Sequence, residues 1–365
     1  MQTFPLESLS IEEAKALQFK LVDSITRFFS GSEVLTRGDL GVVNGFNQPK
    51  TTNKVEKVLA DFFHSEEALL VRGSGTNAIR LSLHSAVGYG GRLLVHSAPI
   101  YPTTEVSLNL MGIEPIFVNF NENLEVLKAV RSYQLDGILI QVTRQKINDS
   151  YNMTQLIHQI RKENTTIPII TDDNYAALKT KVIGTEVGAN LSNFSTFKLL
   201  GPEGVGCIIG ERKYIERLRR ENYSGGGQVQ GHEALDVLRG MIYAPVSLAI
   251  SAEVSDEVCR RLNNGEVQNI EQAFVINAQS RVVIVRLTKN ISKQVIKAST
   301  KLGALPNPVG AESKYEFSPL IYRVSSTFRE VDSSAEETML RINPNRAGTD
   351  TIIRILREAM EQIKE

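Results

Sequence analysis

The sequence predicts an α/β fold, with a large domain built on a mainly parallel sheet flanked by helices and a smaller C-terminal α+β domain. Strand-like apolar segments alternate with helix-like segments up to about residue 240, where this regular pattern ends. A glycine turn, an acid and a lysine each follow one of the predicted strands. Alternation of this kind is typical of a parallel sheet covered by helices on both faces. At 365 residues the chain is long enough to form both hydrophobic cores.

The first predicted element is a helix that begins after Ser10. Ser10-Ile11-Glu12-Glu13 is a capping box, and apolar residues then recur at helical spacing. Loops rich in Gly and Asn follow as far as Asn47. The strands predicted for the large domain are residues 68–71, 92–95, 115–119, 137–142, 167–171, 192–197 and 205–209.

The smaller domain is predicted from a less regular series of elements. Strands are expected at residues 281–287, 322–325 and 339–342, and helices at 292–302 and 351–363. We therefore expect residues 1–45 to form an N-terminal helix and arm that packs with the small domain or a partner, 46–240 the large domain, and 241–365 the small C-terminal domain.

Composition narrows the classes of function. Lys and Arg together number 41, as do Asp and Glu, and this zero net charge argues against nucleic acid or acidic membrane partners. The sequence shows neither a terminal leader pattern nor an apolar run near the roughly 20 residues of a membrane span. The two cysteines, Cys207 and Cys259, suit a reducing compartment, and no His or Cys spacing is typical of a metal site. We expect a cytoplasmic protein without a metal.

Lys198 is the most informative residue of the chain. It lies between the predicted strand 192–197 and a turn that begins at Gly201-Pro202. Burial at the end of a strand favours the neutral form of an amine, and a neutral amine attacks a carbonyl to form a Schiff base. The aldehyde that this chemistry suggests is pyridoxal 5'-phosphate (PLP).

Two further segments support that cofactor. Gly73-Ser74-Gly75-Thr76-Asn77-Ala78 joins strand 68–71 to a helical run, and free N–H groups at a helix N-terminus bind phosphate. Asp172 and Asp173 follow strand 167–171, where an acid can pair with a pyridinium nitrogen. Adjacent strand residues face opposite ways, so only one of the two acids can meet the ring. Because ligands bind at the carboxyl ends of parallel strands, we expect loop, acid and lysine in one cleft.

In this order the three features resemble the fold-type I PLP-dependent enzymes, the aspartate aminotransferase superfamily, from about Asn53 to the C-terminus. Asp172-x-x-Tyr175 is similar to a class I aminotransferase motif, which implies that Asp172 meets the ring nitrogen and Tyr175 the ring hydroxyl. Ser195-x-x-Lys198 is similar to a motif in which the serine also touches the phosphate. Residues 194–210 look more like the class V and selenocysteine synthase-like branches. Class V members often use another spacing after the acid, so Asp173 stays an alternative.

The resemblance implies further site residues. Tyr101 is a candidate to stack on the pyridine, with a turn tyrosine as the alternative and His96 as the substitute. Arg144 follows strand 137–142, a region that approaches the cofactor and substrate in the family, and its alternative is a solvated loop. Arg341 or Arg346 is the candidate for a substrate carboxylate, because arginine binds carboxylates with two parallel hydrogen bonds. The alternative for Arg341 is a cross-strand ion pair.

A glycine run, Ser224-Gly225-Gly226-Gly227-Gln228, suggests an oligomer. Such a run is too flexible to hold itself in place, and in the superfamily a neighbouring subunit often completes the phosphate site. We therefore expect a homodimer, with a flexible surface loop as the alternative.

The expected function is PLP chemistry on an amino acid or a related amine, in which Lys198 forms the Schiff base and then moves a proton. An aminotransferase is the first expectation. The alternatives are a lyase (ammonia or β-elimination, or a selenocysteine synthase-like exchange) and a non-catalytic PLP-binding protein.

Overall fold

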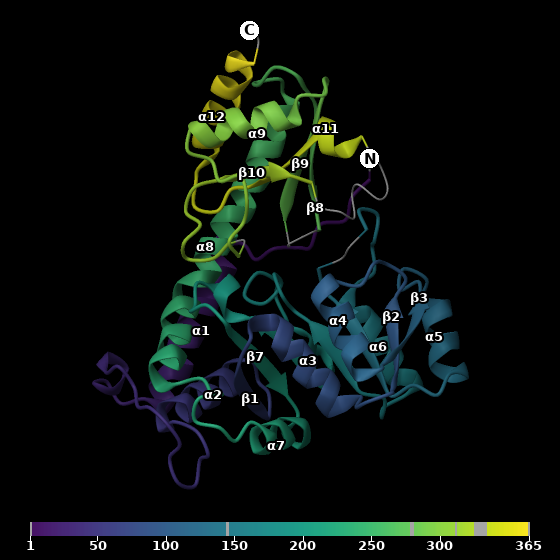
Figure 1. Cartoon of the computed structure of the whole chain (residues 1–365), viewed down its shortest axis with the longest axis vertical. Helices are drawn as coiled ribbons and strands as arrows, with labels where there is room; N and C mark the ends of the chain where they lie inside the picture. The colour runs from purple at the N-terminus through teal and green to yellow at the C-terminus, as the bar shows by residue number, and fades with distance from the viewer. Residues whose placement is uncertain (1, 144–145, 278–280, 311, 325–333, 364–365) are drawn as a thin grey trace. The chain divides into compact units, whose positions relative to one another are not determined.

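The chain folds into two compact units in a computed structural model that describes all residues except 1, 144–145, 278–280, 311, 325–333 and 364–365. The larger unit comprises Glu12–Thr143 and Ser150–Pro245, and the smaller comprises Met1–Ile11, Arg144–Asp149 and Val246–Glu365 (Figure 1). The boundary between the two units falls after Pro245, within a long helix, whereas the sequence predicted a boundary at residue 240. Most of the expected N-terminal arm belongs to the larger unit.

The larger unit is built on a seven-stranded sheet in the order β1-β7-β6-β5-β4-β2-β3. β7 is antiparallel to both neighbours, and the other adjacent pairs are parallel, so the predicted mainly parallel sheet is confirmed. The strands are β1 (Glu67–Arg72), β2 (Arg92–His96), β3 (Glu114–Val118), β4 (Gly137–Gln141), β5 (Ile169–Asp172), β6 (Leu191–Ser195) and β7 (Val205–Gly210).

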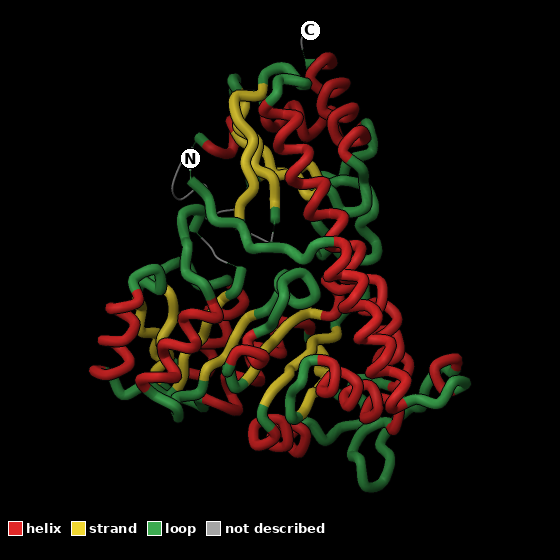
Figure 2. The backbone as a smooth tube through the Cα atoms, turned by 180° about the vertical axis from the view of Figure 1, so that it is seen from behind, coloured by secondary structure: helices red, strands yellow, loops and turns green. Residues whose placement is uncertain are grey.

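Helices cover both faces of this sheet (Figures 1 and 2). The helical elements are α1 (Ile11–Phe28), η1 (Glu33–Leu35), α2 (Lys50–Phe62), α3 (Ser74–Ala86), α4 (Pro102–Met111), α5 (Asn123–Ser132), α6 (Met153–Glu163), η2 (Gly184–Val187), η3 (Thr196–Leu199) and α7 (Arg212–Glu221), where η marks a 3₁₀ turn. α3, α4 and α7 pack on one face, and α5 and α6 on the other. In β2, Leu93 and Val95 join the first core and Leu94 the second, as the two-residue period of a strand requires.

The smaller unit has a four-stranded antiparallel sheet in the order β10-β11-β9-β8. Its elements are β8 (Ile270–Ile276), β9 (Val282–Leu287), α9 (Ser292–Lys301), β10 (Leu320–Arg323), α11 (Ala335–Thr338), β11 (Met339–Asn343) and α12 (Thr349–Gln362). α9, α12 and the last part of α8 (Gly231–Asn263) share one apolar core with the sheet. β8 was not predicted from the sequence, because only its second half is buried and its apolar signal is short.

α8 is 33 residues long and contains Pro245. In the described part of the chain it is the one helix long and apolar enough to cross a membrane, judged by length and composition. It is therefore an exception to the expectation that no segment approaches the length and apolarity of a membrane span. Half of its 18-residue apolar window is buried inside the protein, as in a core helix.

Candidate active site

Lys198 lies just past the carboxyl end of β6, in the 3₁₀ turn η3. The sequence analysis extended this strand to residue 197, but the strand ends at Ser195. Thr196 ties the turn to the neighbouring strand by donating from Oγ1 to the carbonyl oxygen of Val205 at 2.9 Å. Leu200 then adopts a left-handed conformation with a φ of 63°, which ends the turn. The lysine is thus held by a short turn pinned to β7.

Lys198 is partly buried and contacts two residues of the loop after β5. Its Nζ donates to Asn174 Oδ1 at 3.3 Å and lies 3.8 Å from the centroid of the Tyr175 ring. Tyr175 has a φ of 63°, and Nζ of the buried Lys179 lies 5.5 Å from the same ring centroid. The fold therefore brings Lys198 and Tyr175 together.

Asp172 faces the lysine. It is buried at the end of β5, and its Oδ1 accepts hydrogen bonds from the backbone N–H of Asn174 at 3.0 Å and from Asn174 Nδ2 at 2.7 Å. Burial raises the pKa of Asp172, while the positive charge of Lys198 and the Asn174 hydrogen bonds oppose that shift. Both of these hydrogen bonds from Asn174 end on Oδ1 of Asp172. Within the described residues, Oδ2 therefore stays available to accept a hydrogen bond from another donor.

Asp173 points elsewhere. It is fully buried and accepts hydrogen bonds from Thr171 Oγ1 at 2.5 Å and from the backbone N–H of Gly184 at 3.1 Å. Burial raises the pKa of Asp173 to about 7, against the hydrogen bonds from Thr171, Gly184 and Ser192. The two acids thus lie in different environments, as strand alternation predicts, and Asp173 holds η2 against the sheet.

Asn174 is a site residue that the sequence analysis missed. Its side chain is 8% exposed, and its Oδ1 accepts from both the backbone N–H of Ser195 at 2.9 Å and Lys198 Nζ. Gly75 packs directly against it, since a Cβ at position 75 would lie 2.5 Å from Asn174 Oδ1. Gly75, the second glycine of the loop, was the sequence signal that pointed to a close contact here. Only the fold shows that its partner is Asn174.

The glycine loop forms the N-terminus of α3, as expected. Gly73 precedes the helix with a φ of 92°, a conformation that favours glycine. The backbone N–H groups of Gly73 and Ser74 both donate to the carbonyl oxygen of Gly204, at 2.8 and 3.0 Å, so the expectation that they are free is wrong. The N–H groups of Gly75 and Thr76 have no hydrogen-bond partner within the described residues, and they remain available to an anion.

This arrangement fits PLP. Besides the two available N–H groups, the Ser74 and Ser195 hydroxyls are hydrogen-bonded to each other at 2.6 Å, and the pair keeps one further donor for a phosphate. Asp172 keeps one carboxylate oxygen for a ring nitrogen, and Lys198 supplies the amine. Each group lies at the carboxyl end of its strand or at the start of the following helix, where ligands of open α/β sheets bind.

The two candidates for ring stacking differ in exposure. Tyr101 immediately precedes α4 and is exposed. His96, the substitute, is buried, and its Nδ1 accepts from the backbone N–H of Phe120 at 3.0 Å. Its ring also packs on those of Phe120 and Tyr151, with centroids 5.5 and 5.0 Å away. His96 is therefore a core residue of this unit.

The candidate substrate arginines belong to the smaller unit. Arg144 lies outside the described residues. Arg341 is buried in β11, with its guanidinium 4.9 Å from the centroid of the Tyr322 ring. Arg346 is partly buried, and its NH2 group donates to the carbonyl oxygen of Glu312 at 2.9 Å. Its NH1 group is buried and has no hydrogen-bond partner among the described residues, and burial lowers the pKa of Arg346.

The glycine run is held by its own chain. Gln228 is buried, forms a β-bridge with Val71, and donates from Nε2 to the carbonyl oxygens of Asn47 and Asn222. Gln230 Nε2 donates to the carbonyl oxygen of Gly225 at 2.7 Å. The premise that this run needs a partner to become ordered is therefore wrong, because flanking glutamines anchor it. The homodimer itself stays a prediction.

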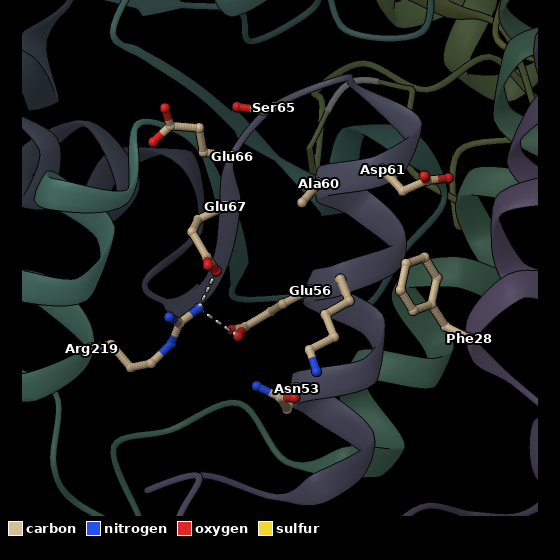
Figure 3. Close-up of a pocket in the computed structure, with 10 residues that line it drawn as sticks. Phe28, Asn53, Glu56, Ala60, Asp61, Ser65, Glu66, Glu67 and Arg219 are labelled. Atoms are coloured by element: carbon tan, nitrogen blue, oxygen red, sulfur yellow. Dashed lines mark hydrogen bonds and ion pairs between the residues drawn. The ribbon is translucent and has the colours of Figure 1, made fainter.

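A separate pocket of about 320 Å³ is lined by Glu56, Glu67 and Arg219, among other residues (Figure 3). Glu67 is the first residue of β1, so the pocket lies at the end of this strand opposite to the glycine loop. Arg219 lies between Glu56 and Glu67, at 3.3 Å from each, and Leu70 donates its backbone N–H to Glu56 at 2.9 Å. Burial raises the pKa of Glu56, and the charge of Arg219 opposes the shift. Because its buried carboxylate is already paired, we assign this pocket a structural role.

Comparison with known families matches both parts of the chain. Residues 45–237 match the aminotransferase class-V family. Residues 256–356 match the YhfS-like C-terminal domain family.

Comparison with individual proteins identifies near and distant relatives. The uncharacterized protein YhfS of Escherichia coli (strain K12) is 50% identical over 363 residues, which is 100% of each chain. The crystal structure of the pyridoxal-5'-phosphate dependent protein YhfS from Escherichia coli superposes with a TM-score of 0.98 over 100% of both chains. A cystathionine gamma-lyase (CalE6) from Micromonospora echinospora has a TM-score of 0.72, 13% identity, and coverage of 94% of this chain and 99% of its own. At that identity the likeness shows the fold alone.

Proposed function

The chain belongs to the class-V aminotransferase family and is a PLP-dependent enzyme of fold type I, and on this premise we propose that it acts on the amino group of an amino acid or a related amine through Lys198. The observation that carries the proposal is the meeting of Lys198, Asp172 and the N-terminus of α3 at one edge of the sheet. When bound, PLP supplies a carbonyl carbon that reacts with amines and a ring that accepts electrons from the substrate.

The chain's own groups divide the work. Lys198 Nζ, which donates to Asn174 Oδ1, would hold the cofactor and is the group that would take up a proton from the substrate. Asp172 Oδ2 would accept a ring N–H and so favour the protonated ring, while Asp173 accepts hydrogen bonds from Thr171 and Gly184 and supports the loop. Tyr175 lies against the lysine amine, and exposed Tyr101 is the candidate to cover the ring.

The phosphate is assigned to the start of α3. The N–H groups of Gly75 and Thr76 and the positive end of the helix dipole attract an anion. The Ser74 and Ser195 hydroxyls are hydrogen-bonded to each other at 2.6 Å, which leaves one of their two protons to donate to the same group.

Arg346 is the better of the two candidates for a substrate carboxylate. Its NH1 group is buried without a hydrogen-bond partner among the described residues, so it keeps donors for a carboxylate. Arg341 is more deeply buried, with its guanidinium over Tyr322. Arg144 stays a third candidate, outside the described residues.

The reaction beyond the shared amine chemistry divides into two candidates. Transamination is the first, because the larger unit matches the aminotransferase class-V family. A lyase is the second, because structural neighbours include cystathionine lyases. Incubation with amino acids and amino sugars separates the two. A transaminase needs a keto-acid acceptor to turn over, whereas a lyase releases ammonia or a side-chain fragment without one.

We also propose a cytoplasmic homodimer. Leu40 and Val42 of the N-terminal arm, Phe46 after them and Tyr223 beside the glycine run are exposed. The two segments lie side by side, because Gln230 Oε1 accepts the backbone N–H of Gly41. Exposed apolar side chains on neighbouring segments support an interface there.

Lys198 can be tested directly as the cofactor-binding amine. Protein loaded with PLP is reduced with borohydride, digested, and mapped by mass spectrometry. We expect the pyridoxyl group on Lys198, and Lys198→Ala should lose both the label and the visible absorbance band of the bound cofactor. A label on Lys179 or Lys181 contradicts the assignment.

A further inference from the structure

Asn174 joins the two charged groups of the candidate site. We propose that it is a positioning residue that keeps the Lys198 amine apart from the Asp172 carboxylate. The amine then stays able to react with a carbonyl, and the carboxylate stays able to meet a ring nitrogen. The inference deepens the proposed function and rests on it, since it assigns a task to one more residue of the same site.

The geometry places the amide of Asn174 between the two groups. Oδ1 accepts from Lys198 Nζ at 3.3 Å, and Nδ2 donates to Asp172 Oδ1 at 2.7 Å. The backbone N–H of Asn174 donates to the same carboxylate oxygen at 3.0 Å. Lysine and carboxylate already interact electrostatically, because the charge of Lys198 lowers the pKa that burial raises in Asp172. Without the amide, this attraction in a buried site would draw the two into an ion pair.

A neutral amide suits this position. An amide oxygen accepts an N–H from an amine whether or not the amine is protonated. A carboxylate in direct contact favours the ammonium form, which has no lone pair for attack. Among the charged groups near the amine, Lys179 beside the Tyr175 ring favours the neutral form, and Asp172 opposes it. By separating the two groups, the Asn174 amide limits how strongly the Asp172 carboxylate favours the ammonium form of Lys198.

The surroundings fix the orientation of the amide. The backbone N–H of Ser195 donates to Oδ1 at 2.9 Å, so Nδ2 cannot occupy that side without facing a donor. Asp172, an acceptor, fixes the other end. Gly75 leaves the room in which the amide lies, because a Cβ there would come within 2.5 Å of Oδ1. The side chain therefore has one arrangement in which every bond is satisfied.

The experiment measures the reactivity of Lys198 without cofactor. Apoprotein is pulse-labelled with limiting acetic anhydride from pH 6 to 11, and peptide mass spectrometry follows acetylation of Lys198. We expect Asn174→Ala to raise the pH midpoint of Lys198 labelling by about one unit, which is roughly a tenfold slower reaction below the midpoint. Adding Asp172→Asn should return the midpoint at least to the wild-type value, because the attracting charge is gone.

Asn190→Ala is the matched control. Asn190 is also buried, and its Oδ1 accepts the backbone N–H of Ile169 at 2.6 Å. This contact lies at the starts of β5 and β6, whereas Asp172 and Lys198 lie at the other ends of these strands. It should leave the Lys198 midpoint unchanged. An unmoved midpoint in Asn174→Ala, or a rise that Asp172→Asn fails to reverse, overturns the inference. Because the label is read in apoprotein, this outcome is distinct from a failure of Lys198 to capture PLP, which borohydride mapping reports.

Discussion

At the scale of single residues, Asp172 and Asp173 are adjacent, buried and chemically identical, yet they occupy different environments. Asp172 lies beside Lys198 with one oxygen left for a ring nitrogen, whereas Asp173 is bonded to Thr171 and Gly184. We expect Asp172→Asn to lower kcat at least tenfold more than Asp173→Asn, because a neutral amide cannot keep the ring protonated. Turnover of each PLP-loaded variant on the same amino substrate measures this. Equal losses, or the reverse order, would move the role to Asp173.

Asp173 should instead influence stability. Burial raises its pKa from the usual 3.8 to about 7. Between those pH values the folded protein holds a proton that the unfolded chain has lost. The free energy of unfolding therefore falls as pH rises from about 4 to about 7, by at most about 1.4 kcal/mol per pH unit from this group. Urea unfolding of apoprotein at pH 5 and pH 8 should show a smaller decline in Asp173→Asn than in wild type. The same decline in both proteins would contradict the prediction.

At the scale of elements, the start of α3 is shaped by its contacts with β5, β6 and β7. Gly75 has no room for a side chain, because a Cβ there would lie 2.5 Å from Asn174 Oδ1. We expect Gly75→Ala to displace Asn174 and to weaken PLP binding at least tenfold, since the same helix turn carries the two available N–H groups. Fluorescence titration of apoprotein with PLP measures the affinity. Gly31→Ala is the control, because nothing lies within 4 Å of its Cβ position, and it should bind PLP as wild type does.

At the scale of the whole molecule, the proposed dimer predicts that a charge introduced at its interface, beside the N-terminal arm, weakens the association of the two subunits. Leu40 is 70% exposed in the N-terminal arm, beside the segment that carries the glycine run. We expect wild-type protein to sediment as a dimer or a multiple of it at micromolar concentration. Leu40→Asp should shift it toward monomer, because burying an unpaired carboxylate is costly. Leu124→Asp, on the 82% exposed Leu124 of α5, should leave the dimer intact. A wild-type monomer would exclude the proposal.

Local patterns determined the architecture of this protein. The larger sheet followed from apolar runs bounded by turns, because burial on both faces leaves parallel strands such as β2, β4 and β5 largely apolar. Loop, acid and lysine could be found because each is a short motif at a strand end. β8 was not predicted, because only its second half is fully buried and its apolar signal is short. Lys198 was placed at the end of a strand, but its 3₁₀ turn depends on a bond from Thr196 to another strand.

Only the tertiary structure decided how these parts meet. The backbone N–H groups of Gly73 and Ser74 donate hydrogen bonds to the carbonyl oxygen of Gly204, which is far along the chain. The tertiary structure anchored the glycine run through Gln228, whose partner Asn47 lies just after the N-terminal arm. It also separated Asp172 from Asp173 and brought Asn174 between acid and lysine. Sequence periodicity reports which residues are buried, whereas hydrogen bonds between distant segments depend on a fold that no local pattern contains.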